Sequence, residues 1–220
     1  MSTLAARGVG VTFGHAVVFD DVDVELARGE TVGLRGPSGC GKSTLARVLA
    51  LLHGPDRGHV SIDGSPIEGA RYAVPVATRT RIALLFQSPR AAADPRLSLL
   101  DLIAEPLLAT GTDRTTGRAR ARALADDVGL TEDLLERRPH AVSDGQLQRA
   151  CLARALVHNP DYLLLDEATA MLDASTQALV AQVLIAYQRQ HQAGVLLVSH
   201  DLALLDRWAD RTIDWNELIS

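Results

Sequence analysis

A glycine-rich stretch in the first quarter of the chain has the composition of a phosphate-binding loop. Gly36-Pro-Ser-Gly-Cys-Gly41-Lys42-Ser43 fits the pattern Gly-x-x-x-x-Gly-Lys-Ser/Thr, between an apolar segment and a helical one. Its glycines let successive backbone N–H groups curl around an anion, and the next helix presents its positive end. Lys42 can reach the outer phosphates of a nucleotide, and the Ser43 hydroxyl can bind Mg²⁺. Taken alone, the stretch could also be a glycine turn followed by a chance Lys-Ser pair.

A second acidic element follows an apolar segment much later in the chain. Four apolar residues at 162–165 precede Asp166 and Glu167. Ligands of open α/β sheets bind at the carboxyl ends of the strands, which is where these carboxylates fall. There Asp166 can hold Mg²⁺ and its water, and Glu167 can orient or deprotonate an attacking water. With the glycine loop, the pair predicts an NTPase, and the lack of a guanine-reading Asn-Lys-x-Asp pattern favours ATP.

The stretch Ser143-Asp144-Gly145-Gln146 begins a segment whose apolar residues recur at helical spacing. The apolar residues are Leu147, Cys151, Leu152, Ala155 and Leu156. One interpretation is a helix start with Ser143 or Asp144 as the N-cap. The other is a helix whose positive end is presented to a ligand. These residues alone leave both interpretations open.

Strand and helix patterns are distributed unevenly along the sequence. Apolar, β-rich segments predict strands at 8–13, 21–26, 30–36, 59–64, 82–87, 162–167 and 194–200. Helical patterns lie near 42–53, 98–109, 114–128, 145–158, 174–192 and 201–209. The early strands alternate and suit an antiparallel edge sheet, whereas the last two are continuous apolar runs typical of covered parallel strands. We therefore expect one domain over residues 1–220, in which 1–88 and 160–220 form an α/β core with a β subdomain and 89–159 form a helical subdomain.

Composition narrows the class of protein. The chain has 220 residues, of which 47% are hydrophobic and 22% charged, as expected of a globular domain. A net charge of −5 does not favour a nucleic-acid partner, and the arginines of 113–127 predict a solvated helix face. Cys40 and Cys151 are expected to be free thiols in a reducing compartment. With no signal-peptide pattern and no long apolar run, the sequence predicts a cytoplasmic location.

Taken in order along the whole chain, these stretches resemble the motifs of the ATP-binding cassette (ABC) family. Phe13 corresponds to the aromatic residue that stacks on adenine, Gln87 in "LLFQSP" to the Q-loop, and His200 in "LLVSHD" to the switch histidine. Residues 142–146 resemble the signature sequence, and Met171-Leu172-Asp173 the D-loop. The resemblance implies a P-loop NTPase (RecA-like) core with an antiparallel β edge subdomain and an inserted helical subdomain.

The resemblance also implies site residues. It gives catalytic roles to Glu167, His200, Gln87 and Lys42, and Mg²⁺ ligation to Ser43, Gln87 and Asp166. It implies ATP binding by Phe13, Gly36, Pro37, Ser38, Gly39, Cys40, Gly41, Lys42, Ser43, Thr44, Ser143, Gly145, Gln146 and Asp173. In this family two cassettes pack head to tail, so that Ser143 and the Gly145 N–H would touch the γ-phosphate of ATP held by the other cassette.

Two departures from the family pattern concern these motifs. Asp144 replaces the first signature glycine, which places a carboxylate beside a phosphate-binding helix end and leaves open a weakened site. Ala168 and Ala170 replace the usual Pro and Ser after the catalytic Glu, which changes loop stiffness without removing a Mg²⁺ ligand.

Two longer stretches, 86–111 and 137–156, resemble the peptide/nickel importer group of cassettes. That similarity predicts the ATPase subunit of an importer of peptides or of nickel and other metal chelates, peripheral on the inner face of the cell membrane. Its expected partners are a second ABC ATPase subunit, either a copy or a different chain, and integral membrane permease subunits that insert a coupling helix into the helical region. The alternative is a soluble ABC-type ATPase module without a channel.

Overall fold

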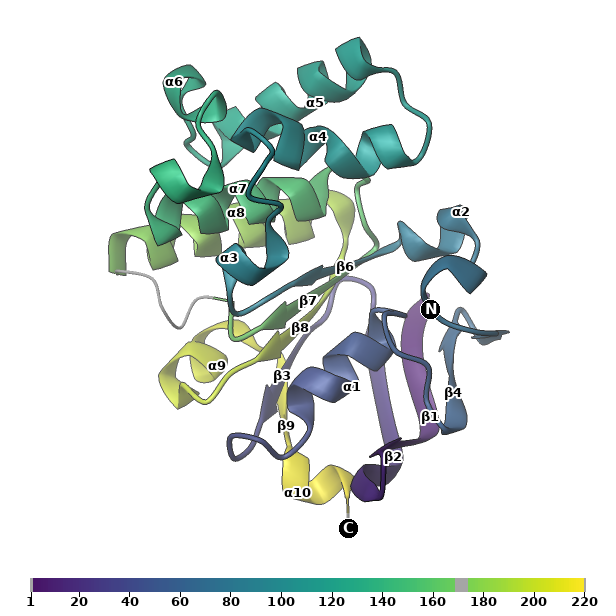
Figure 1. Cartoon of the computed structure of the whole chain (residues 1–220). Helices are drawn as coiled ribbons and strands as arrows, with labels where there is room; N and C mark the ends of the chain where they lie inside the picture. Colours follow the sequence, from purple (N-terminus) through teal and green to yellow (C-terminus); the bar gives the residue numbers. More distant parts are fainter. Residues whose placement is uncertain (1, 169–173, 220) are drawn as a thin grey trace. The chain divides into compact units, whose positions relative to one another are not determined.

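The computed structural model describes residues 2–168 and 174–219, which divide into two compact units (Figure 1). The first unit takes its described residues from Met1–Leu84, Asp161–Glu167 and His191–Ser220, and the second from Leu85–Pro160 and Ala168–Gln190. The sequence-based division instead places all of 160–220 with the core. The largest difference is the segment 168–190, in which Leu179 lies beside Gly129 and the Tyr187 hydroxyl donates to the Pro160 carbonyl at 2.9 Å. Ala170 and the predicted D-loop with Asp173 lie outside the described residues.

The first unit contains a four-stranded antiparallel sheet of order β2-β1-β4-β5. Its strands are β1 (Thr3–Phe13), β2 (Ala16–Ala27), β4 (Arg57–Ile62) and β5 (Ser65–Ile67). Along β2, buried Val22, Val24 and Leu26 alternate with more exposed polar residues, so one face packs on the core. The predicted antiparallel edge sheet is confirmed, and β1 and β2 are both longer than the sequence pattern indicates.

A five-stranded sheet of order β6-β7-β8-β3-β9 forms the centre of the first unit. Its strands are β3 (Thr31–Arg35), β6 (Ile82–Leu85), β7 (Tyr162–Asp166), β8 (Gly194–Val198) and β9 (Arg211–Asp214). The pairs β7–β8, β8–β3 and β3–β9 are parallel, so the carboxyl ends of these four strands share one edge. All of β7 and β8 is buried, as their continuous apolar sequences predict. The sequence analysis did not predict β5 or β9.

The helices of the first unit are η1 (Arg71–Ala73), α2 (Val76–Arg79), α1 (Lys42–Leu49), α9 (Leu202–Trp208) and α10 (Trp215–Leu218). Two of them, α1 and α10, contact both sheets of the unit. Helix α1 contacts both β1 and β7, and its buried Leu45, Val48 and Leu49 belong to one apolar cluster with residues of both sheets. The helix that follows the glycine loop is therefore fixed from two sides.

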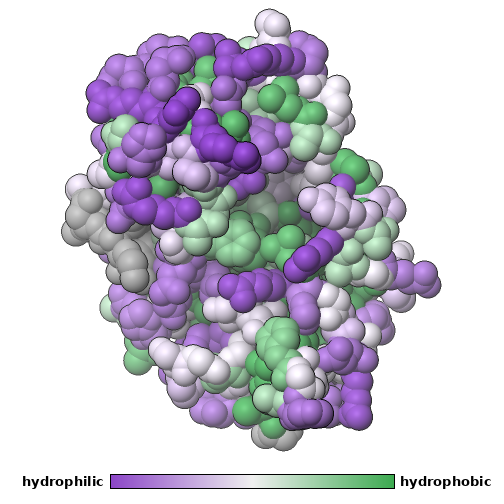
Figure 2. Space-filling view, viewed as in Figure 1, coloured by the Kyte–Doolittle hydropathy of each residue, from purple (hydrophilic) through white to green (hydrophobic). Residues whose placement is uncertain are grey.

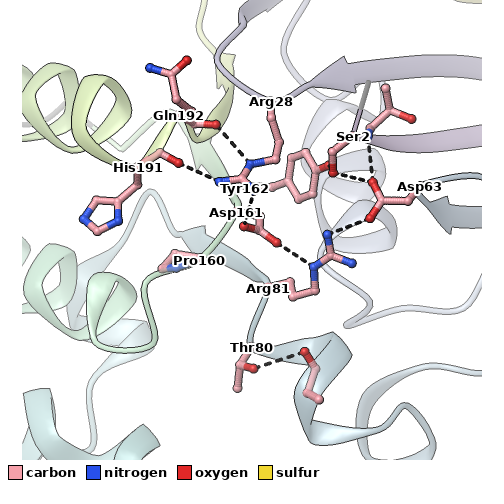
Figure 3. Close-up of polar contacts among 12 residues, drawn as sticks. Ser2, Arg28, Asp63, Thr80, Arg81, Pro160, Asp161, Tyr162, His191 and Gln192 are labelled. Carbon is pink, nitrogen blue, oxygen red and sulfur yellow. Dashed lines mark hydrogen bonds and ion pairs between the residues drawn. The ribbon is translucent and has the colours of Figure 1, made fainter.

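A network of charged side chains lies at the amino end of β7 (Figure 3). Arg81 Nε donates to Asp161 Oδ2 at 2.6 Å, and Arg81 Nη2 donates to Asp63 Oδ2 at 2.9 Å. Asp161 also pairs with Arg28 at 3.3 Å, and Asp63 accepts a hydrogen bond from the Ser2 hydroxyl. The network ties the start of the chain and the β4–β5 turn to the central sheet.

The second unit is helical among its described residues. It comprises α3 (Pro89–Ala92), α4 (Leu99–Ala109), α5 (Arg114–Asp127), α6 (Glu132–Leu135), η2 (Pro139–Ala141), α7 (Asp144–Leu156) and α8 (Ala174–His191, with His191 in the first unit). Ser98, Asp113 and Ser143 cap α4, α5 and α7 through side-chain oxygens that accept backbone N–H groups. Figure 2 shows hydrophilic side chains gathered over α5 at the top of the view, where Arg114 and Arg122 are exposed, as the predicted solvated face requires.

Candidate functional site

The glycine loop runs from the end of β3 to the start of α1, as the sequence predicts. Gly41 is the N-cap of α1 with φ 118°, and Gly39 has φ 79°, both in the left-handed region that glycine adopts without strain. A Cβ on Gly36 would lie 2.6 Å from Trp215 Cβ, and one on Gly41 would lie 2.9 Å from the Trp215 ring. Glycine is therefore required at both positions by space, and at Gly41 also by conformation.

Trp215, at the start of α10, packs against this loop and is fully buried. Its ring packs edge-on against Phe19 with centroids 5.6 Å apart. Before it, Asp214 pairs with Arg35 at the end of β3, with Oδ2 3.0 Å from Nε. These contacts hold β9 and α10 against the strand that leads into the loop.

Lys42 is held within the loop by the loop's own carbonyl groups. Its Nζ donates to Gly36 O at 2.8 Å and to Pro37 O at 2.6 Å, and only 5% of the residue is exposed. Cys40 Sγ lies 3.6 Å from the same nitrogen. The ammonium group is thus placed among the backbone groups that are suited to bind phosphate oxygens.

Both cysteines are free thiols, as predicted. Cys40 is half-buried in the loop, whereas Cys151 is buried in α7. Burial raises the pKa of the Cys151 thiol to about 11, so it stays protonated at neutral pH and acts as a small apolar side chain.

Ser43 and Asp166 meet where α1 begins and β7 ends. Ser43 Oγ donates to Asp166 Oδ1 at 2.8 Å, and Asp166 is buried. Burial raises the pKa of Asp166, although the Ser43 hydrogen bond and the charges of Arg47 and Lys42 oppose that shift, and neighbouring Glu167 adds to it. A bound cation would reverse this cost because it favours the ionised carboxylate.

The Ser43 and Asp166 oxygens fit Mg²⁺ as donors. Mg²⁺ prefers oxygen ligands in octahedral geometry at about 2.0–2.1 Å, which places adjacent ligands about 2.9 Å apart. The observed separation of 2.8 Å agrees with that spacing. Hydroxyl and carboxylate oxygens at the mouth of a phosphate loop therefore form a donor set that a nucleotide's phosphates could complete.

Glu167 follows directly and lies beside His200. Glu167 has φ 49°, an uncommon conformation for a residue with a side chain, and its N–H donates to Val198 O at 3.0 Å. Its Oε1 lies 3.4 Å from His200 Nδ1. The Glu167 side chain is 18% exposed and that of His200 63% exposed, so the pair faces outward from the sheet edge. A carboxylate so placed is suited to accept a proton from water.

Phe13 ends β1 with half of its ring open to solvent. It is 53% exposed, and its centroid lies 5.2 Å from that of His53, with the planes inclined by 52°. An exposed flat aromatic braced by a second ring is suited to stack on a base. The first unit thus holds Phe13, the loop, Asp166, Glu167 and His200.

The remaining described candidates belong to the second unit. Ser143 caps α7 in a capping box, with its Oγ accepting from Gln146 N at 3.2 Å and its N–H donating to Gln146 Oε1 at 2.9 Å. The capping interpretation is thereby confirmed. A Cβ on Gly145 would lie 3.2 Å from the Thr176 side chain, so α8 packs closely there. Gln87 follows β6 and is exposed, with Ser88 capping α3 behind it.

The structure adds residues that the sequence analysis did not identify. Gln148, fully buried in α7, donates its Nε2 to Ala168 O at 2.7 Å and to Phe86 O at 3.5 Å, and so links the residues that adjoin Glu167 and Gln87. The sequence does mark Gln148, because it is a polar residue on the apolar face of α7. His53 and Trp215 gave no such signal, because their partners are distant in sequence.

Comparisons with known proteins show the family of this chain. A family model described as ABC transporter matches residues 19–170. The nickel import ATP-binding protein NikE of Escherichia coli K12 is 40% identical over 200 residues, which cover 90% of this chain and 75% of that protein. NikE of Escherichia coli O157:H7 is 38% identical over the same length, with the same coverage.

Two solved structures of the ATP-binding cassette MJ0796 are similar in fold. A dimeric post-hydrolysis state bound to ADP and Pi superimposes with a TM-score of 0.85 at 28% identity, covering 96% of this chain and 93% of that one. A second dimeric structure of the same bacterial ABC transporter cassette gives a TM-score of 0.86 with the same identity and coverage. The expected P-loop NTPase fold class is confirmed.

Proposed function

Because the chain belongs to the ABC transporter family, we propose that its first unit binds ATP and that its second unit contacts ATP held by another cassette. The protein is an ATP-binding and ATP-hydrolysing subunit of an importer. Its similarity to nickel import ATP-binding proteins, at 40% identity, supports nickel or a nickel chelate as the cargo of the complex. Peptide import is the related possibility within the same group.

One observation carries the proposed site in the first unit. The glycine loop, the Ser43–Asp166 pair at 2.8 Å and the Glu167–His200 pair at 3.4 Å all lie at the carboxyl edge of one parallel sheet. Lys42 and the loop N–H groups bind the β- and γ-phosphates, and Ser43 and Asp166 hold Mg²⁺. When bound, Mg²⁺ neutralises phosphate charge.

Glu167 accepts the proton of the attacking water, and His200 holds the γ-phosphate in place beside it. Phe13 stacks on adenine. The loop offers backbone N–H groups to the phosphates, and Pro37 has none to offer. These groups belong to Gly36, Ser38, Gly39, Cys40, Gly41 and Thr44. Gln87 belongs to the second unit, and the family motif gives it the role of the Q-loop glutamine.

The N-terminal end of α7 contacts ATP that is bound by a second cassette. Ser143 Oγ accepts the Gln146 N–H, so its own proton remains available for a phosphate oxygen. The Gly145 N–H and the helix dipole add further attraction for an anion. Capping and ligand binding are therefore compatible roles for Ser143. The dimeric MJ0796 cassette structures support this pairing of two cassettes.

We place the protein on the inner face of the cell membrane, attached to integral permease subunits. Among the residues that the structure describes, no helix combines the length and the apolar character needed to cross a bilayer. The second unit, rich in short helices, is the docking site for a coupling helix of the permease, and ATP-driven closure of two cassettes moves the attached permease.

The proposed function is tested by reconstitution. The chain is co-expressed with candidate permease and cassette partners, and ATP hydrolysis and ⁶³Ni²⁺ uptake are measured in vesicles. We expect uptake that needs ATP and stops when Lys42 is replaced by Ala, with Arg57→Ala as the control because Arg57 is an exposed residue of β4 that pairs with Asp20 in the first unit. ATP hydrolysis without stable binding to any multispan partner would instead favour a soluble ATPase module.

A further inference from the structure

Arg90 lies three residues after Gln87, in α3, and its guanidinium group is bound to the segment that leads into α7. Nη1 donates to Pro139 O at 3.0 Å, and Nη2 donates to Val142 O at 3.2 Å. The third nitrogen, Nε, lies 2.6 Å from Asp144 Oδ1. All of these residues belong to the second unit. All three guanidinium nitrogens of Arg90 are thus directed at residues around the start of α7.

Asp144 occupies the first turn of α7, beside the cap residue Ser143. An acidic residue there is favourable for the helix by itself, because it faces the positive end of the dipole. The same carboxylate opposes the approach of a polyphosphate, because like charges repel. A phosphate-binding role for this helix end therefore requires that the charge of Asp144 be offset.

We propose that Arg90 is a positioning residue that neutralises Asp144, and so keeps the Ser143–Gln146 end of α7 able to bind the γ-phosphate of a nucleotide held by a second cassette. The inference rests on the proposed function of this helix end. Arg90 does not touch the nucleotide. It acts by cancelling the one negative charge in the motif.

The exposure of the pair explains why its effect should appear in nucleotide-driven association rather than in folding. The Arg90 and Asp144 side chains are 48% and 62% exposed, and ion pairs exposed to this degree contribute little to stability. When a second cassette brings a phosphate to this helix end, water is displaced and charge interactions strengthen. The cost of an unpaired carboxylate then rises.

The test is a double-mutant cycle in a Glu167→Gln background, in which ATP is consumed only slowly. Arg90→Ala, Asp144→Gly and the double variant are compared with the parent for ATP-Mg²⁺-driven self-association, measured by sedimentation velocity. We expect Arg90→Ala to weaken association about tenfold, which corresponds to about 1.4 kcal/mol. Asp144→Gly in the same chain should restore it, because the double variant has the parent's local charge.

The restored double variant separates charge neutralisation from a structural role. The double variant still lacks the Arg90 bonds to Pro139 and Val142, so a merely structural arginine would leave association weak in both Arg90 variants. Arg96→Ala is the control, since it removes an exposed cation that pairs with Asp94. Thermal melting should differ little among all variants. Equal association of parent and Arg90→Ala, or no restoration by Asp144→Gly, overturns the inference.

A second readout holds even if the chain does not associate with itself. Inorganic phosphate is titrated into the isotopically labelled chain, and the shift of the Gly145 amide signal gives the affinity of the helix end. The inference predicts weaker binding in Arg90→Ala and recovery in the double variant. Failure of self-association in every variant would count against a homodimer in the proposed function, whereas an unchanged phosphate affinity in Arg90→Ala would count against the inference itself.

Discussion

The two ends of β7 carry acidic side chains in opposite arrangements. At the amino end, Asp161 pairs with both Arg81 and Arg28, and Arg81 also pairs with Asp63 (Figure 3). At the carboxyl end, Asp166 adjoins Glu167 in sequence and accepts a hydrogen bond from the neutral Ser43 hydroxyl. At the amino end, arginines of the chain pair with the carboxylates. At the carboxyl end, the carboxylates are suited to bind a cation that arrives with a ligand.

The pKa directions of the two ends express the same difference. At the amino end, the hydrogen bond from Ser2 lowers the pKa of Asp63; partial burial opposes this, and Arg81 adds to it. At the carboxyl end, burial raises the pKa of Asp166. A carboxylate with a lowered pKa stabilises the fold when ionised, while one with a raised pKa destabilises it. Ionised carboxylates therefore stabilise the fold at the amino end of β7 and destabilise it at the carboxyl end.

The largest effect is expected from Lys42→Ala. The substitution removes the ammonium group held by Gly36 and Pro37, and we expect ATP to bind about 100-fold more weakly, or about 2.7 kcal/mol. Equilibrium binding of a fluorescent ATP analogue measures the change. Arg81→Ala removes a cation from the amino end of β7 and should leave ATP affinity unaltered. Equal losses in the two variants would contradict the division between the ends.

Gly36→Ala is expected to have the next largest effect. The new Cβ would lie 2.6 Å from Trp215 Cβ, and overpacking of this kind costs about 1–3 kcal/mol in the free energy of unfolding. Chemical denaturation measures the loss, and ATP affinity should fall with it. The matched control is Gly194→Ala, where a Cβ would lie 2.6 Å from Ala27 O near the amino end of β7. That variant should lose stability and, while folded, bind ATP normally.

Asp166→Asn should stabilise the protein while it impairs hydrolysis. Because the folded-state pKa of Asp166 is raised, its ionisation costs stability as pH rises through the window from 3.8 to that raised pKa, and the cost persists at pH 7. We expect a gain in stability at pH 7 that vanishes below pH 3.8, the ordinary pKa of this carboxyl group. Melting curves of both proteins against pH provide the test, and a variant less stable at pH 7 than the parent would refute the account.

Asp63→Asn should have the smallest effect and the opposite sign. The folded-state pKa of Asp63 is lowered, so its contribution is present above the unfolded value of 3.8 and disappears as pH falls through the folded pKa. Solvent screens this half-exposed group, and we expect a loss of less than about 1 kcal/mol at pH 7. The same melting series measures it, and ATP turnover should not change.

The sequence predicts the elements of this fold best where the local pattern is strong. β7 and β8 are continuous apolar runs, and both are buried strands in the structure. β9 has only one apolar residue among Arg211-Thr-Ile-Asp214, so periodicity gives no signal for it. It forms because it pairs in parallel with β3, a partner far away in the sequence.

The same distinction holds for the site. The glycine loop is a contiguous pattern whose chemistry follows from its own residues, and its conformation agrees with that pattern. The residues that contact the loop and the start of α7 come from distant segments of the sequence. Trp215 packs against Gly36, and Arg90 pairs with Asp144. Such pairs depend on how the chain folds back, so spacing along one sequence does not reveal them. Asp144 was visible as a departure, but its compensating arginine was not.

Whether the carboxyl end of β7 forms the site of ATP hydrolysis is tested by the behaviour of Glu167→Gln with ATP and Mg²⁺. Nucleotide binding, hydrolysis rate and solution mass by light scattering are measured on the same sample. We expect retained ATP binding, turnover lower by about 10³-fold, and a stable complex of two cassettes formed with ATP. Hydrolysis at the wild-type rate would contradict the role given to Glu167 and, with it, the contrast between the two ends of β7.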